Sequence, residues 1–106
     1  MKKIAATLAL LLALTVPVVA GFMLHGQVSV ATTATKIVDA HPTRRVLVII
    51  NEGTTDVRLG TSSGVTTSNG ALLTGTKGAS LSIEGGAAVW AIVGTGTQTV
   101  SYLEQF

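Results

Sequence analysis

Short apolar stretches alternate with turns rich in glycine and threonine from Gln27 to the C-terminus, and this spacing constrains the fold more than any other feature. Residues 46–60, VLVIINEGTTDVRLG, show the unit: an apolar strand, a polar connection and a second strand. No part of this region has the 3.6-residue apolar period of an amphipathic helix. The pattern predicts an all-β domain, a small antiparallel β-sandwich or barrel of about seven short strands.

Two continuously apolar stretches mark the interior of the predicted domain. Residues 46–50, VLVII, predict a strand that is covered on both faces, because a strand with one solvated face alternates apolar and polar residues. Residues 87–93 predict a central strand, with Trp90 in or beside the core. These two strands are the predicted core of the fold.

Other stretches alternate, or carry the residues of a tight turn. Leu81 and Ile83 alternate with polar residues and predict a half-buried strand. Residues 57–60 predict a strand with Arg58 pointing outward, and residues 98–103 predict the closing strand. Asn69-Gly70 predicts a type I′ hairpin turn between residues 65–67 and 71–73.

The N-terminal residues are a different kind of sequence, and they divide the chain into a hydrophobic segment, residues 1–26, and a β module, residues 27–106. Lys2 and Lys3 precede an uncharged, mainly apolar run over residues 4–24, which predicts a hydrophobic helix. The run has the layout of a signal peptide with a cleavage site after Ala20. At about 1.5 Å per residue it is also long enough to be a membrane anchor, and a helix buried against protein is the third alternative.

The charge balance excludes a class of partner. The formal charge of +2 comes from seven basic and five acidic residues, and Lys2 and Lys3 supply the whole excess. The β module is therefore neutral and has no basic field that would attract a nucleic acid. Its aromatic residues are Trp90, Tyr102 and Phe106, too few for a base-stacking platform. We expect no nucleic-acid partner.

The chain contains no cysteine, so a disulfide cannot stabilise this small domain. Small domains without disulfides or metals often gain stability by forming oligomers. Charged residues make up 11% of the chain, against about 25% in an ordinary domain. Few charges and many hydroxyl side chains indicate that much of the surface contacts other protein, and we expect a homo-oligomer.

Candidate groups for catalysis or metal binding are sparse. His41 lies in a proline turn near Asp39, but no nucleophile motif accompanies the pair. Asp39 and His41 lack a third metal ligand at usable spacing, and the loop with Glu52 and Asp56 lacks the dense acidic spacing of a calcium loop. The sequence predicts a protein that is not an enzyme, with no cofactor and no metal.

Three arginines are the predicted polar contacts to a partner. Arg44 and Arg45 directly precede the apolar stretch 46–50, and Arg58 points outward from its strand. Guanidinium groups form paired hydrogen bonds with carboxylates and phosphates, which makes them good interface residues. The alternative for Arg44-Arg45 is a charged pair that keeps an apolar strand from aggregating.

The segments RRVLVIINEGTTDVRLG, GVTTSNGALL and AAVWAIVGTGTQTVSYLE together resemble small β modules among the virion proteins of tailed bacteriophages. The resemblance covers about residues 28–106 and lies in the order of strands and turns. It implies a structural virion component: a capsid decoration or cement protein, or a head-fibre accessory protein, often trimeric. The implied partner is the major capsid protein or another virion protein, and the implied location is the virion.

The N-terminal segment departs from this family, whose head proteins normally carry no export signal. Residues 4–24 could anchor the module in a capsid or a membrane, the chain could start downstream, or the module could belong to a secreted protein. The alternative function is therefore a secreted or membrane-anchored β module for adhesion or glycan binding. Such a module would use exposed Trp90 or Tyr102 as a stacking platform.

Overall fold

The computed structural model describes residues 21–106 and consists of eight strands with no helix among these residues. The strands are β1 (Met23–Val30), β2 (Thr35–Val38), β3 (Val46–Asn51), β4 (Val57–Gly60), β5 (Ala71–Leu73), β6 (Ser80–Glu84), β7 (Val89–Val93) and β8 (Gln98–Gln105). The predicted N-terminal helix and the cleavage site after Ala20 lie outside the described residues. Within residues 21–106 the structure has no helix that could span a membrane.

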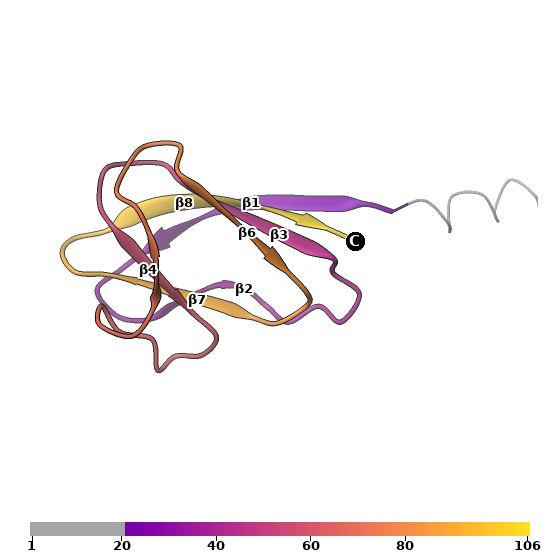
Figure 1. Cartoon of the computed structure of the whole chain (residues 1–106), viewed down its shortest axis with the longest axis horizontal. Coiled ribbons are helices and arrows are strands. Elements are labelled where there is room, and N and C mark those ends of the chain that lie inside the picture. The colour runs from indigo at the N-terminus through magenta and orange to yellow at the C-terminus, as the bar shows by residue number, and fades with distance from the viewer. Residues whose placement is uncertain (1–20) are drawn as a thin grey trace, which may run out of the picture.

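The strands form two antiparallel sheets of four strands each (Figure 1). We call the sheet with the order β1-β8-β3-β6 sheet A, and the sheet with the order β2-β7-β4-β5 sheet B. Consecutive strands mostly lie in different sheets, and this order is that of a double-sheet jelly roll. The all-β prediction is confirmed. The fold is a sandwich, with eight strands in place of the predicted seven or so.

The core lies between the sheets and follows from the two-residue period of the strands. Sheet B contributes Val57 and Leu59 from β4, and Val89, Ala91 and Val93 from β7. Sheet A contributes the following buried residues: Val30, Leu47, Ile49 and Val100. The predictions that β7 is central and that Arg58 points outward from β4 are both confirmed.

The prediction that residues 46–50 are covered on both faces is wrong. Along β3 the residues alternate between half-buried and buried, so Leu47 and Ile49 face the core while Val46, Val48 and Ile50 face outward. No layer of the described chain lies over the outer face of sheet A. An apolar run therefore reaches the surface here.

The type I′ turn at Asn69-Gly70 is also wrong. Neither residue has a positive φ, which a type I′ turn requires at both central positions. Residues 65–67 form no strand, and β4 and β5 are joined by a loop over residues 61–70. The Asn69 side chain instead holds this loop, because its Oδ1 accepts from the Thr66 N–H at 2.7 Å.

β1 begins inside residues 1–26, which the sequence predicts to be the hydrophobic N-terminal segment. It starts at Met23, four residues before Gln27, and its eight residues pair in continuous register with β8 (Figure 1). The start of β1 is difficult to recognise in the sequence, because Met23 and Leu24 continue the apolar composition of residues 4–24. The result is that one long strand extends at the edge of sheet A.

Candidate assembly surface

The outer face of sheet A is the broadest candidate site on the described part of the chain. The register places outward-facing residues of β1, β8, β3 and β6 in adjacent rows. Val48 on β3, for example, lies beside Leu103 on β8 and Ser82 on β6. The face consists of Met23, His25, Gln27, Ser29, Thr99, Ser101, Leu103, Gln105, Val46, Val48, Ile50, Ser80, Ser82 and Glu84. We call this set the sheet A face.

Apolar side chains occupy the middle of the sheet A face, and small polar side chains surround them. Val46, Val48 and Ile50 are half-buried, and Leu103 is 38% exposed. Among the residues of the face, Glu84 is the one with a formal charge at neutral pH. A shallow depression on this face is lined in part by His25, Ile50 and Leu103. Such a surface can bind protein by apolar contact and hydrogen bonding.

Arg44, the first predicted contact residue, is buried in a cluster at one end of the sandwich. Its guanidinium forms an ion pair with Glu104 at 3.0 Å, and the two side chains are 0% and 4% exposed. It also donates to the backbone oxygens of Asp39, at 3.2 Å, and Gly85, at 3.1 Å, and to that of Ala87. Arg44 therefore joins the 39–45 segment, the β6–β7 turn and β8. Its guanidinium forms its hydrogen bonds within the fold and is not exposed to a partner.

Arg45 and Arg58 differ from Arg44 and from each other in their surroundings. Arg45 is exposed, just before β3 in sheet A, and its backbone N–H donates to Gln105 O at 2.7 Å. Arg58 is half-buried on the outer side of sheet B and donates to Gly70 O at 3.2 Å. The three arginines do not form one patch, and partner contact through Arg45 or Arg58 stays a prediction.

The groups considered for catalysis are separated in the structure. Asp39 is paired with Lys36 at 3.1 Å, while His41 Nε2 lies 3.6 Å from Glu104 Oε2. Glu52 accepts from Ser101 Oγ at 2.7 Å, and Asp56 accepts from the Gly75 N–H at 2.6 Å. Across residues 21–106 no group of three His, Cys, Asp or Glu side chains could hold a metal. Asp39, His41, Glu52 and Asp56 therefore have separate partners in the described part of the chain.

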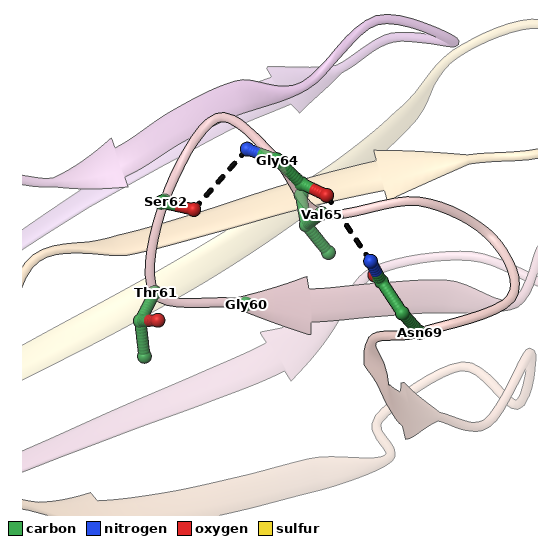
Figure 2. Close-up of a pocket in the computed structure, with 6 residues that line it drawn as sticks. All are labelled: Gly60, Thr61, Ser62, Gly64, Val65 and Asn69. Carbon is green, nitrogen blue, oxygen red and sulfur yellow. Dashed lines mark hydrogen bonds between the residues drawn. The ribbon is translucent and has the colours of Figure 1, made fainter.

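A small polar pocket lies in the loop between β4 and β5 (Figure 2). Its lining residues are Gly60, Thr61, Ser62, Gly64, Val65 and Asn69. Asn69 Nδ2 donates to Gly64 O at 3.1 Å, and the Gly64 N–H donates to Ser62 Oγ at 3.2 Å (Figure 2). These bonds hold the loop in shape, and none of the lining side chains is charged. We therefore interpret the pocket as a structural feature of the loop.

The alternative function would use exposed Trp90 or Tyr102 as a stacking platform, and both residues are half-buried in the structure. Trp90 is half-buried on the outer side of sheet B, and Lys36 Nζ lies 5.3 Å from the centroid of its ring. Tyr102 packs against the core and lies over Gly26, whose missing side chain leaves room for the ring. Neither ring is therefore the fully exposed stacking platform that the alternative function requires.

The sequence reasoning missed two buried polar residues and the exposed start of β1. Glu104 and Asn51 are 3% and 0% exposed and complete the polar networks inside the fold. The missed surface residues are Met23 and His25, which the predicted boundary placed in the N-terminal segment. The alternation of Gln27, Val28, Ser29 and Val30, extended backward, was the available signal.

Comparison with known proteins shows the fold alone. No family model and no curated protein matches the chain. A structure from Bacillus endospore appendages, a family of disulfide-linked pili, matches with a TM-score of 0.54 and 15% identity, over 81% of this chain and 83% of that chain. This chain has no cysteine with which to form such links.

A hydroxypropylphosphonic acid epoxidase from S. wedmorenis matches with a TM-score of 0.49 and 18% identity. The match covers 76% of this chain and 42% of the enzyme, so the chain spans less than half of that protein. At 15% identity, the likeness to the pilus protein shows a similar all-β fold and nothing more.

Proposed function

We propose that this chain is a non-catalytic structural protein that works by binding other protein subunits through the sheet A face. The observation that carries the proposal is an open sheet face with apolar residues at its centre and one formally charged residue, Glu84. Exposed apolar surface gains about 25 cal/mol per Å² when a partner removes it from water. The charged groups at this face are Glu84 and Glu52, which accepts from Ser101 Oγ, so a partner can cover the apolar centre while desolvating few ions.

The finer form of the proposal is an accessory protein of a tailed-phage virion, of the capsid decoration, cement or head-fibre type. It rests on the sequence resemblance over about residues 28–106 and is compatible with a jelly roll, a fold found in viral capsid proteins among others. The partner would be the major capsid protein or another virion protein. A trimer is the oligomer that the resemblance implies.

A second candidate is a subunit of a secreted or surface-assembled structure, in place of the virion. The observation in its favour is the fold likeness to the endospore appendage protein, which covers most of both chains. The signal-like layout of residues 1–20 agrees with it. Both candidates use the same sheet A face, but they place the protein in different compartments.

Fractionation of the natural source, followed by intact-mass measurement, separates the two candidates. We expect the chain in sedimenting particles, with a full-length or Met-trimmed mass, if it is a virion protein. A mass that starts at Gly21, found in cell-surface or medium fractions, supports the secreted candidate. A chain found in neither kind of assembly, as a free monomer in every fraction, overturns the proposed structural role.

A further inference from the structure

β1 is an edge strand with a long unpaired side. All eight of its residues pair with β8, and within residues 21–106 no other strand pairs with it. The N–H and C=O groups on the free side of an edge strand are a ready template for another strand. Natural proteins protect such edges by keeping the strand short or by placing charges, prolines or bulges on it.

The other three edge strands of the described sheets carry such protection. β2 has four residues, includes Lys36 and shifts register between Lys36 and Val38. β5 has three residues, and β6 has five and ends in Glu84. β1, with the sequence MLHGQVSV, has eight residues, no formal charge, no proline and an unbroken register. Among the edge strands of residues 21–106, β1 is the one that lacks these protective features.

The start of β1 also exposes large apolar side chains. Phe22 and Met23 are both 58% exposed, and Leu24 is 43% exposed. Phe22 stacks on Phe106 with ring centroids 4.5 Å apart, which fixes this end of the strand against the C-terminus. The Phe22 ring is therefore held directly before the first residue of the edge strand.

The features of this edge favour a second copy of β1 as its partner. No other edge of the described sheets exceeds five residues, so only β1 itself matches the length of β1. An uncharged strand also meets no unpaired charge when it lies beside its own copy. Antiparallel pairing of identical strands gives a two-fold interface, the commonest symmetry among homo-oligomers.

The two-residue period restricts the register of such a pair. Odd-numbered residues of β1 face outward and even-numbered residues face the core, as the pairing with β8 requires. The outward-facing residues of the two strands lie on the same side of the joined sheet only if even residues pair with even and odd with odd. In a two-fold pair this means that one residue lies opposite its own copy. An axis at Gly26 or at Gln27 satisfies this condition and keeps nearly the whole strand paired.

We propose that β1 pairs antiparallel with β1 of a second copy across a two-fold axis at Gly26 or Gln27, which joins two copies of sheet A into one continuous sheet. This inference rests on the proposed assembling role and names its partner, a second copy of the chain. It differs from the trimer that the sequence resemblance implies, because a two-fold contact builds dimers or even-numbered assemblies.

Sedimentation velocity of the full chain, with one edge variant and one matched control, tests the pairing. Gln27→Lys places two like charges beside the axis in either register, which opposes pairing. Thr76→Lys is the control, because Thr76 is exposed in the loop between β5 and β6 and belongs neither to β1 nor to the sheet A face. We expect wild type and Thr76→Lys to sediment as dimers, at twice 10.8 kDa, and Gln27→Lys to dissociate at a concentration about tenfold higher or more.

Single cysteines give a second readout, because the chain has none of its own. Directly opposite residues of an antiparallel pair have Cα atoms about 4.5–5.5 Å apart, within disulfide range. Gln27→Cys should form a disulfide dimer if the axis lies at Gln27, and a mixture of His25→Cys with Gln27→Cys should do so if it lies at Gly26. Thr99→Cys should not, because two copies of β8 would lie about 14 Å apart or more.

Several outcomes overturn the edge pairing. The pairing is refuted if wild type is a monomer or a trimer, or if Gln27→Lys dimerises as well as Thr76→Lys. It is also refuted if Thr99→Cys forms as much disulfide dimer as the β1 cysteine variants. A chain that assembles on particles and is yet insensitive to Gln27→Lys refutes the edge inference and leaves the proposed function standing. A chain that forms dimers sensitive to Gln27→Lys but is absent from all larger assemblies supports the edge inference and refutes the proposed function.

Discussion

Arg44 and Arg45 are neighbours in the sequence with opposite surroundings in the fold. Arg44 lies inside a cluster with Glu104 and three backbone oxygens, whereas the Arg45 side chain is exposed. The sequence identified the pair as important but could not distinguish its members, because the difference depends on where strand β3 begins. One residue of shift would exchange their environments.

Arg44→Ala should strongly destabilise the protein, because it removes the 3.0 Å ion pair of the buried Glu104 carboxylate and leaves it with the more distant His41, at 3.6 Å, as its partner. Loss of one partner of a buried ion pair costs about 3–5 kcal/mol, whereas an exposed surface substitution such as Arg45→Ala stays within about 0.5 kcal/mol. Urea unfolding followed by Trp90 fluorescence measures both free energies. Equal losses for the two variants would show that the Arg44 cluster contributes no special stability.

Asn51→Ala and Asn69→Ala form a second matched pair. Asn51 Nδ2 donates to the oxygens of Thr55 and Thr74, at 2.8 and 3.0 Å, and its Oδ1 accepts from the Gly53 N–H. Asn69 also bonds loop backbone, but it is exposed, so water replaces the lost partners. Since a buried polar group without a partner costs about 1–3 kcal/mol, we expect Asn51→Ala to lose clearly more stability in urea unfolding. A larger loss for Asn69→Ala would contradict this explanation.

At the level of elements, the sequence predicted the alternating strands well and the continuous ones less well. The alternation of Leu81 and Ile83 with polar residues reveals which side of β6 faces inward, and the sequence predicts β6 over its whole length. The run 46–50 carries no alternation, so its two faces cannot be told apart from composition. The Asn69-Gly70 turn was mistaken because Asn69 uses its side chain to hold the loop, a use that the dipeptide alone does not reveal.

Adjacent residues of β3 should respond oppositely to a charge. Ile49 is fully buried in the core, and Val48 is half-buried on the sheet A face. Ile49→Asp buries a carboxylate without a partner, at a cost of several kcal/mol, and should prevent folding. Val48→Asp should fold. Far-UV circular dichroism and Trp90 fluorescence distinguish the two states, and a folded Ile49→Asp would show that the strand register is wrong.

At the level of the whole molecule, the features that point to function are surfaces. The sequence predicted a neutral, assembling β module, and the structure places the few charges of the described chain mostly away from the sheet A face. The sequence could not define that face, because it gathers residues of four strands that are distant in the chain. It also could not identify the β1 edge, since strand order determines which strands lie at an edge.

The most direct test of the central claim is the amount of each variant bound to particles in the natural source. Val48→Lys puts a charge in the middle of the sheet A face, and Leu72→Lys puts the same charge at an exposed apolar residue of sheet B. Sedimentation of particles followed by quantitative mass spectrometry gives the number of chains per particle. We predict that wild type and Leu72→Lys remain bound while folded Val48→Lys is lost from the particles; equal binding of both variants would contradict assembly through the sheet A face.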